Sequence, residues 1–378
     1  MEERWPWEEE SSLEAPDPLA HQRHEESVKE KLPRVIKLLD VQDTVMGQSS
    51  PHQTGDIVCY DILKRAPVYD LTSHFSDIKP HAPARGAHRH ISAPTLFCLR
   101  GRGWEINDGK TYSFGTYDML VVPPFTIHQH GGDEDAGAQI FVPQSRMLSI
   151  LGLTKREQIK FGEKPKFPDG TQPLHDENGK LIGYRIQKGV LGIKDAIDVM
   201  LGGDPKTEAV FRARKEAEPW QGPVENTYDG YLKLFHDESV FCNTVTHVVS
   251  YDAEPWEWCR QGKLKWFTHP EMNSAARRLW LYMQEIPPGS RSGVHRHMVE
   301  EQILIIEGRG HDLHDSERFD WERGDLVSIP AMTAHQHFNA DAKSPALFLS
   351  SMPSVGADLG LGGIEQLEDA PEFANENG

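Results

Sequence analysis

The chain has 378 residues, of which 38% are hydrophobic and nine are Trp, so it can form two ordinary hydrophobic cores. Its formal net charge of −18 argues against nucleic acid or an anionic membrane surface as a partner, because both require a basic face. The sequence has no apolar run long enough for a membrane span and no apolar signal-peptide core near Met1, so we expect a cytoplasmic protein.

The first predicted elements are a polar arm and a helix, which together make up residues 1–50. Residues 1–23 are acidic and contain prolines, which indicates a mobile arm. Residues 24–40 have apolar side chains at roughly helical spacing, which predicts a helix that Pro33 must interrupt.

Residues 51–145 are predicted to form a β domain, because short apolar runs alternate with turn residues. The candidate strands are Thr95–Leu99, Met119–Val122 and Gln139–Val142. Asn107-Asp108-Gly109 is a hairpin signal.

Residues 146–240 are predicted to be a helical linker with a surface loop. Met147–Ile159 and Lys194–Glu218 have helix-favouring compositions. Pro165–Asn178 between them is rich in Pro, Gly and Asp and indicates a loop.

Residues 241–356 return to the β pattern, and residues 357–378, which are Gly-rich and acidic, are predicted to be a flexible tail. The strand candidates of this second β domain are Leu279–Met283, Ile303–Ile306, Leu326–Ile329 and Ala346–Leu349. The expected fold class is therefore all-β with a helical linker, consisting of two tandem barrels or jelly rolls.

The four cysteines do not form a metal-binding or disulfide pattern. Cys59, Cys98, Cys242 and Cys259 include no pair with C-x-x-C spacing. We expect free thiols in a reducing compartment.

Both β domains contain the same histidine motif, offset by 207 positions. The first copy contains the pair His88 and His90 and a later pair, His128 and His130. The corresponding residues of the second copy are His295, His297, His335 and His337. Alternate residues of a strand share a face, so each copy directs four imidazoles to one side of its sheet. Three are enough for a facial metal site, and the fourth can hydrogen-bond or carry a proton.

The spacing of the second copy resembles the two motifs of the cupin family. Gly289, His295, His297, Glu301 and Gly308 reproduce the first cupin motif. Gly324, Pro330, His335 and Asn339 reproduce the second, with Met332 in place of a Gly. The resemblance implies a double-stranded β-helix for each domain and the metal ligands His295, His297, Glu301 and His335, a set that suits Fe(II) or Mn(II).

The first copy lacks the carboxylate, because Pro94 is the counterpart of Glu301. His88, His90 and His128 remain as ligands. This combination resembles the bicupin ring-cleaving dioxygenases of the gentisate 1,2-dioxygenase and salicylate dioxygenase type. The resemblance implies an Fe(II)-dependent, extradiol-type dioxygenase. Its substrates would be O2 and a hydroxylated or amino-substituted aromatic carboxylic acid. The ring would open between the carboxyl-bearing carbon and its substituted neighbour.

The resemblance also implies a homo-oligomer, a dimer or tetramer, and a role for His130 as a proton carrier. Members of that family often carry an Arg near the substrate at the position of Leu96. The substrate anchor therefore remains open, with Arg102 as one candidate beside three other arginines, Arg85, Arg260 and Arg278.

Three alternatives remain open. The full motif with Glu301 favours a Mn-dependent bicupin lyase that resembles oxalate decarboxylase. A metal-dependent small-molecule-binding protein without catalysis is the second, and a cupin isomerase or epimerase is the third.

Overall fold

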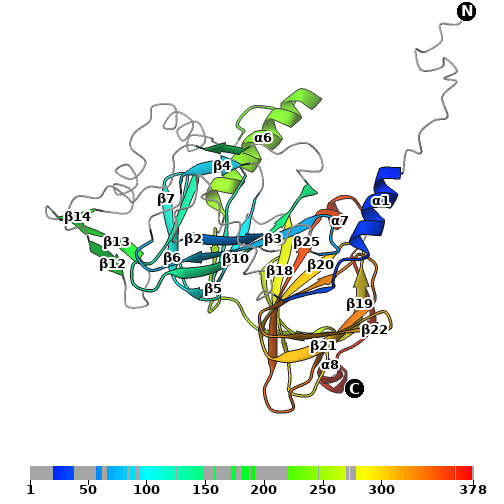
Figure 1. The fold of residues 1–378 in the computed structure, drawn as a ribbon. Coiled ribbons are helices and arrows are strands. Elements are labelled where there is room, and N and C mark those ends of the chain that lie inside the picture. Colours follow the sequence, from blue (N-terminus) through cyan, green and yellow to red (C-terminus); the bar gives the residue numbers. More distant parts are fainter. Residues whose placement is uncertain are drawn as a thin grey trace, which may run out of the picture.

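We describe the protein from a computed structural model (Figure 1). The structure describes residues 20–37, 57–61, 66–82, 86–90, 93–124, 126–147, 156–158, 172–175, 181–186, 189–191, 220–245, 247–269, 272, 278–361 and 363–376. No helix within these ranges is long and apolar enough to cross a membrane.

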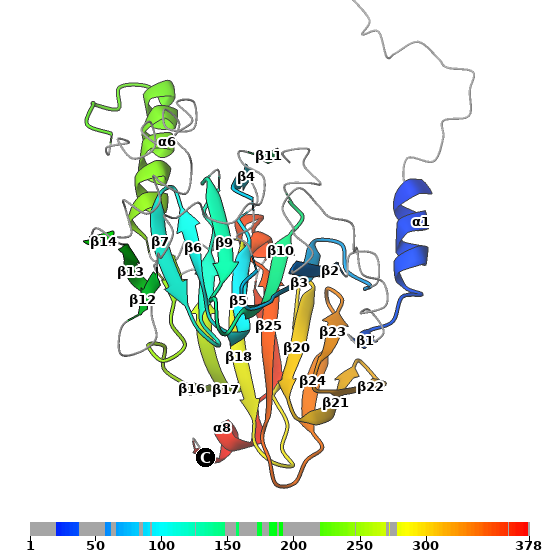
Figure 2. The same cartoon turned by 60° about the vertical axis from the view of Figure 1, so that its left-hand side comes forward.

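The fold is mostly β and consists of two barrels, each made from one large and one small antiparallel sheet (Figures 1 and 2). The large sheet of the N-terminal barrel contains, in spatial order, β15 (Val248–Val249), β8 (Met119–Val121), β5 (Thr95–Gly101), β10 (Ala138–Ser145), β3 (Leu71–Ile78) and β2 (Ile57–Asp61). Its small sheet contains β11 (Arg156–Gln158), β4 (His88–His90), β9 (His128–Gly132), β6 (Gly103–Asn107) and β7 (Lys110–Phe114).

The C-terminal barrel repeats this arrangement. Its large sheet contains β1 (Val35–Lys37), β23 (Asp325–Ile329), β20 (Glu301–Glu307), β25 (Ala346–Pro353), β18 (Leu279–Ile286), β17 (Gly262–Thr268) and β16 (Glu257–Cys259). Its small sheet contains β22 (Glu317–Glu322), β21 (Arg309–His314), β24 (His335–Asn339), β19 (Val294–His297) and β26 (Ile364–Glu368).

A separate sheet is formed by β12 (Gln172–His175), β13 (Leu181–Ile186) and β14 (Gly189–Leu191). The helices are α1 (Ala20–Lys29), α6 (Thr227–Thr244), α7 (Val355–Asp358) and α8 (Pro371–Glu376).

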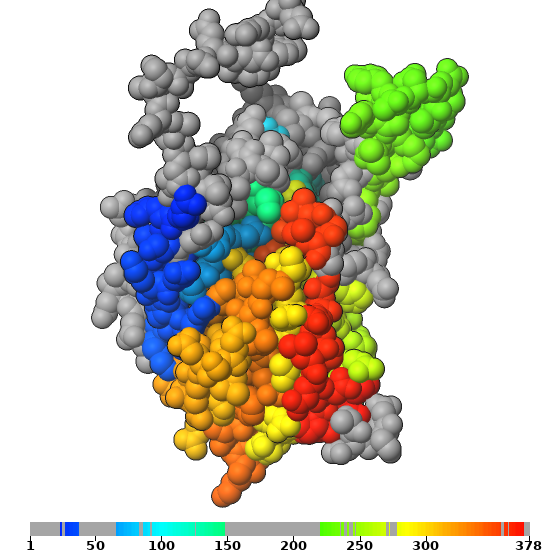
Figure 3. Space-filling model, turned by 90° about the vertical axis from the view of Figure 1, so that its right-hand side faces the viewer, coloured from blue at the N-terminus to red at the C-terminus, as the bar shows by residue number. Residues whose placement is uncertain are grey.

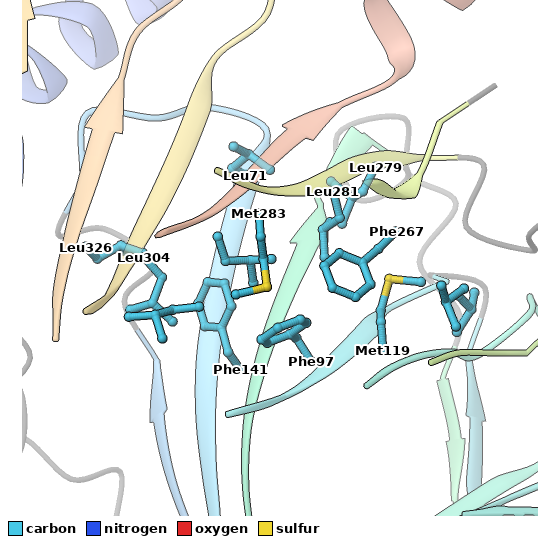
Figure 4. Packing of buried hydrophobic residues seen from close by; sticks show 14 of the residues in the cluster. Leu71, Phe97, Met119, Phe141, Phe267, Leu279, Leu281, Met283, Leu304 and Leu326 are labelled. Atoms are coloured by element: carbon cyan, nitrogen blue, oxygen red, sulfur yellow. The ribbon is translucent and has the colours of Figure 1, made fainter. Parts of the chain in front are cut away.

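The two large sheets pack against each other, so their strands are buried on both faces. In β5, Phe97 belongs to the core between the barrels, whereas Leu96 and Cys98 belong to the core inside the N-terminal barrel. Figure 4 shows Phe97 and Phe141 of one barrel beside Phe267 and Met283 of the other. This two-sided burial explains why these strands appear as continuous apolar runs in the sequence.

The predicted strands and the predicted hairpin are confirmed. Asn107 pairs with Lys110 across a turn in which Asp108 and Gly109 both have positive φ, 44° and 78°. Such a turn matches the right-handed twist of the two strands.

Each barrel receives one edge strand from the segment that precedes the other barrel. β1, at the N-terminal end of the described chain, pairs with β23 of the C-terminal barrel. β15, which precedes the C-terminal barrel, pairs with β8 of the N-terminal barrel. The exchange adds backbone hydrogen bonds to the apolar packing between the barrels.

Two local predictions near the N-terminus and in the linker need correction. The helix expected over residues 24–40 ends at Lys29, and Val35–Lys37 beyond Pro33 is strand β1. Within the expected helix 147–159, Arg156–Gln158 is strand β11, paired with β4. Pairing to an existing sheet edge outweighs the weak helix preference of these short segments.

Two further predictions concern the linker and the tail. Part of the expected loop, Gln172–His175, is strand β12, and the helix expected at 194–218 lies outside the described residues. α6 was not predicted; its first turn is capped by the Asn226 side chain, which accepts a hydrogen bond from the Asp229 N–H at 3.0 Å. The tail expected to be flexible contains β26, which pairs with β19. The side chains of β26 are mostly exposed and include both polar and apolar residues, so the sequence pattern did not indicate a strand.

Candidate metal centres

The three predicted ligands of the N-terminal barrel lie together at one end of its small sheet. His88 and His90 are on β4, and His88 is paired directly with His128 on β9. One nitrogen from each ring lies within 4.8 Å of the others. Ligands around one ion at bond lengths of about 2.1 Å must lie within about 4.2 Å of each other, so only a small adjustment separates these rings from a coordination sphere.

The second barrel forms the same arrangement with a carboxylate added. His295 and His297 on β19, Glu301 at the start of β20 and His335 on β24 offer ligand atoms within 4.8 Å of one another. His295 and His335 are paired across the two strands.

Backbone carbonyls fix the orientation of four of these six imidazoles. Nδ1 of His128 lies 3.0 Å from the Thr126 oxygen, and Nδ1 of His335 lies 2.9 Å from the Thr333 oxygen. Nδ1 of His88 lies 2.9 Å from the Gly86 oxygen and Nδ1 of His297 lies 2.5 Å from the Val299 oxygen. Because a carbonyl only accepts, each Nδ1 carries the proton, and in the neutral ring Nε2 offers its lone pair to a ligand.

The contacts of Glu301 indicate a cation. Its Oε2 lies 3.1 Å from Nε2 of His297 and 3.3 Å from Nε2 of His335. Two nitrogens without protons and a carboxylate oxygen repel one another unless a proton or a metal ion lies among them. The donor set therefore fits a divalent transition metal.

The other oxygen of Glu301 is held by hydroxyl groups. Oε1 accepts hydrogen bonds from the Tyr282 hydroxyl at 3.1 Å and from the Ser350 hydroxyl. Burial alone would raise the pKa of Glu301, but its close contacts with the imidazoles of His297 and His335 outweigh burial and hold the pKa well below its ordinary value. Glu301 is thus an ionised carboxylate with one oxygen directed at the histidines.

Burial also keeps two of the second set of histidines neutral. It lowers the pKa of His295 well below its ordinary value and lowers that of His335, against the opposing charge of Glu301. Neutral rings are the form that binds metal ions.

The fourth histidine of each copy pairs with a buried carboxylate that the sequence reasoning missed. Nδ1 of His130 lies 3.2 Å from Glu105, and Nδ1 of His337 lies 2.9 Å from Asp312. Burial lowers the pKa of His337, but the charge of Asp312 more than compensates and raises it. Glu105 and Asp312 are offset by the same 207 positions as the histidines, and this offset was the signal that could have found them.

The two sites differ in their exposure to solvent. His295, His297, Glu301 and His335 are at most 3% exposed, whereas His90 in the first site is only half-buried. Of the seven candidate ligands, His90 is the most exposed to solvent.

Arg102 is not at the metal centre. It lies between β5 and β6 beside the far end of β9, and its guanidinium contacts both carboxylate oxygens of Asp133 at 3.0 and 3.2 Å. Its neighbour in the strand, Gly103, pairs with Gly132, while His128 is at the opposite end of β9. The roughly 13 Å length of that strand separates Arg102 from the histidines.

The structure describes two of the three other anchor candidates. Arg260 is exposed and pairs with Asp369, and Arg278 directly precedes β18, where its carbonyl accepts a hydrogen bond from the Ser354 N–H at 2.9 Å. Arg85 lies outside the described residues.

Met332, which departs from the second motif, occupies the backbone conformation of the glycine it replaces. Its φ is 65°, and its N–H donates to the carbonyl of His297 at 2.8 Å. This motif position requires a left-handed backbone conformation. Met332, whose side chain is 47% exposed, adopts that conformation at a cost of about 1 kcal/mol.

Comparison with known proteins agrees with this architecture. Residues 282–352 match the family model of the cupin domain. A variant of salicylate 1,2-dioxygenase from Pseudoaminobacter salicylatoxidans in complex with gentisate has a TM-score of 0.55 to this chain at 12% identity, covering 95% of this chain and 98% of that chain.

The chain has a bicupin fold. The oxalate decarboxylase of Lactobacillus farciminis, in a formate complex, has a TM-score of 0.52 to it at 14% identity and covers 88% of each chain. At these identities the likeness concerns the fold of the bicupin and not its reaction.

A short part of the chain is also similar in sequence to another protein. A stretch of 52 residues is 40% identical to an uncharacterized protein of Methanocaldococcus jannaschii, which corresponds to 14% of this chain. The match spans 42% of that relative, less than half of its length.

Proposed function

We propose that this bicupin is an Fe(II)-dependent, extradiol-type dioxygenase. Its substrate is a hydroxylated or amino-substituted aromatic carboxylic acid, whose ring opens between the carboxyl-bearing carbon and the adjacent substituted carbon. The observation that carries the proposal is the His88, His90 and His128 cluster, which has Pro94 where the other barrel has Glu301. Three neutral ligands without a carboxylate leave more coordination positions open for a chelating substrate.

Fe(II) held by three imidazoles would supply open positions for the hydroxy acid and for O2, and the aromatic substrate would supply the electrons that reduce O2. The residues of the chain then orient the substrate and move its proton. His130 shares the inward face of β9 with His128, and its Nδ1 is turned to Glu105. Its Nε2 would take the hydroxyl proton of the substrate, and Glu105 would stabilise the resulting imidazolium. The apolar interior of the barrel, including Leu96 and Cys98, excludes water from the ring.

Oxygen consumption tests this proposal. Protein loaded anaerobically with Fe(II) is mixed with salicylate, gentisate, hydroxynaphthoates and aminobenzoates in air-saturated buffer. We expect O2 uptake matched by loss of the aromatic absorbance for at least one of these acids. Bound iron without uptake for any of them contradicts the proposal.

The second barrel supports a different candidate, a Mn-dependent lyase or decarboxylase. The three-His, one-Glu set is buried so completely that only a small substrate could be accommodated there without rearrangement. Formate release from oxalate by Mn(II)-loaded protein, without net O2 uptake, would favour this reaction. A bicupin that binds a metal and a small molecule without turnover is the remaining alternative, and it predicts neither O2 uptake nor formate.

We further propose that residues 51–145 and 241–356 form the two metal-binding units and that the protein works in a reducing cytoplasm as a homo-oligomer. Cys98 and Cys259 are free thiols, and burial raises the pKa of Cys98 to about 12, which makes it unreactive. Exposed apolar side chains on α6 support self-association.

A further inference from the structure

Glu301, the carboxylate that distinguishes the C-terminal candidate site, has a different set of partners on each of its two oxygens. Oε2 lies beside the ring nitrogens of two histidines, whereas Oε1 accepts hydrogen bonds from the hydroxyl groups of Tyr282 and Ser350. The three side chains come from β18, β25 and β20, which lie side by side in the large sheet of the C-terminal barrel. Tyr282 and Ser350 are paired directly across two of these strands, so the sheet itself fixes the two hydroxyls beside Oε1.

These three side chains are buried away from water. Glu301 and Ser350 are fully buried, and Tyr282 is 3% exposed. The Tyr282 ring also packs against Trp266, with the ring centroids 4.9 Å apart. Burial and the charge of Glu301 raise the pKa of the Tyr282 hydroxyl well above its ordinary value, so this hydroxyl keeps its proton and donates it to Oε1. The carboxylate is therefore held on one side by two fixed donors.

The N-terminal barrel has neither the carboxylate nor the two hydroxyls. β3 pairs with β10 in the same register as β18 pairs with β25, with an offset of 208 positions, one more than that of the histidine motifs. The counterpart of Tyr282 is therefore His74, which pairs with Val142, the counterpart of Ser350. Pro94 takes the place of the carboxylate. The barrel architecture thus does not require hydroxyls at these positions, and they occur only in the barrel that has a carboxylate for them to hold.

We propose that Tyr282 and Ser350 are positioning residues that restrict Glu301 to binding a metal ion through one oxygen. Their hydroxyls occupy Oε1, which leaves Oε2 for an ion held among the histidines. A carboxylate that binds through one oxygen uses one coordination position, whereas one that binds through both uses two. The two hydroxyls would therefore keep a further position open for a small ligand at this site, in spite of the added carboxylate.

The proposal depends on metal binding in the C-terminal barrel and not on the reaction proposed for the N-terminal barrel. The residues that orient a metal ligand usually contribute to affinity nearly as strongly as the ligand's own surroundings, because they fix the ligand before the ion arrives. A carboxylate released from its two donors can rotate and offer both oxygens. Loss of either hydroxyl should therefore change both the affinity for the ion and the arrangement of ligands around it.

The test uses Mn(II) alone as the probe, because its electron paramagnetic resonance spectrum depends on the number and arrangement of its ligands. The full chain with His128→Ala, which lacks a ligand of the other site, is the parent protein. Tyr282→Phe and Ser350→Ala each remove a single oxygen atom from it. Ser351→Ala is the matched control, because Ser351 is equally buried on the same strand but donates to the Gln302 carbonyl at 3.1 Å.

We expect Tyr282→Phe and Ser350→Ala each to weaken Mn(II) binding about tenfold, measured by competition with a fluorescent chelator. The spectrum of bound Mn(II) should change in both variants and stay that of the parent in Ser351→Ala. Parent affinity and parent spectrum in both hydroxyl variants would overturn the proposal, as would an equal change in Ser351→Ala. Neither readout requires turnover, so a failure of the dioxygenase proposal would leave this result unaffected.

Discussion

The two inward-facing histidines of β9 have different partners, and this difference separates metal binding from proton transfer. His128 has its Nδ1 fixed by the Thr126 carbonyl, which leaves Nε2 for a metal ion. His130 has its Nδ1 on Glu105, which can stabilise a protonated ring. His128 therefore has the geometry of a metal ligand, and His130 has that of a general base.

Substitution of each histidine should therefore give a different result. His128→Ala is expected to lose the metal ion of the N-terminal barrel, whereas His130→Ala keeps it and loses about 10²- to 10⁴-fold in kcat. Metal content by elemental analysis and single-turnover rates measure the two effects. Loss of metal in both variants would show that His130 is a ligand.

Arg102 is expected to contribute to stability and not to activity. Its two contacts with Asp133 hold the turn between β9 and β10, where Asp133 also accepts hydrogen bonds from the Asp135 and Ala136 N–H groups. Because Arg102 is 42% exposed, solvent screens the pair, and Arg102→Ala should cost only about 0.5–1 kcal/mol of unfolding free energy. Chemical denaturation and kcat are measured for the same variant. A loss of kcat with unchanged stability would indicate that Arg102 takes part in the reaction.

The same pair predicts a pH dependence. Burial would raise the pKa of Asp133, but the Arg102 hydrogen bond and two backbone N–H groups lower it below its ordinary value. A carboxyl with a lowered folded-state pKa contributes stability above its unfolded pKa of about 3.8 and loses it as the pH falls. The stability difference between wild type and Arg102→Ala should therefore shrink as the pH falls below about 5 and through the folded-state pKa, which lies below 3.8, and a difference that grows with acid would contradict the assignment.

At the scale of elements, Glu300 connects the C-terminal metal site to the other barrel. It is adjacent to Glu301 but points to the opposite side, where it accepts hydrogen bonds from the N–H groups of Tyr69, Asp70 and Leu71 at 2.5–2.6 Å. Two residues further along, Gln302 accepts a hydrogen bond from Ser73 at 2.7 Å. The strand that carries the ligand Glu301 thus also holds the start of β3.

Removal of Glu300 should weaken the contact between the barrels. Glu300→Ala removes the acceptor of three backbone N–H groups, two of which are buried, so we expect a loss of roughly 2–4 kcal/mol in urea unfolding. Glu300→Gln keeps one acceptor oxygen and should lose less. The control is Glu317→Ala on the exposed surface of β22. Equal unfolding free energies for Glu300→Ala and the control would exclude a connecting role.

The sequence predicted the central strands because their apolar pattern reflects burial on both faces. It did not predict β1, β11 and β26, since these short edge strands are fixed by pairing with distant strands and carry polar or mixed side chains. The helix expected over residues 24–40 ends before Pro33, and Val35–Lys37 beyond it gains hydrogen bonds from β23.

The same limit applies to the site. The histidines and Glu301 follow from motif spacing and strand alternation, which are local. Glu105 could have been found from its 207-position offset to Asp312, but nothing in the sequence pattern indicates Tyr282 and Ser350, which contact Glu301 from other strands. Arg102 was one of four candidate anchors for an acidic substrate, and the structure shows it in contact with Asp133.

At the scale of the whole molecule, α6 stands away from the barrels (Figure 3) and presents an apolar stripe. Tyr228, Tyr231 and Leu234 are spaced three residues apart and are 70%, 68% and 67% exposed. Residues three apart lie on the same side of a helix, so the stripe is continuous and can pair with the same stripe of a second copy.

The stripe predicts the state of association. The wild type should have a light-scattering mass that is a multiple of 42.7 kDa, and Tyr231→Lys with Leu234→Lys should shift it toward the single-chain value. Lys233→Ala, on the same helix but outside the stripe, serves as the control. A wild-type mass of one chain, or an oligomer unaffected by the double substitution, would contradict this use of α6.

The central claim is that ring cleavage takes place at the carboxylate-free site of the N-terminal barrel. The most direct test is O2 uptake with an accepted aromatic acid, measured per bound iron, in His128→Ala and in the equivalent variant of the other barrel, His335→Ala. We predict that His128→Ala abolishes uptake, while His335→Ala retains at least a large part of it. Uptake that persists in His128→Ala and disappears in His335→Ala would place the chemistry at the three-His, one-Glu site and contradict this account.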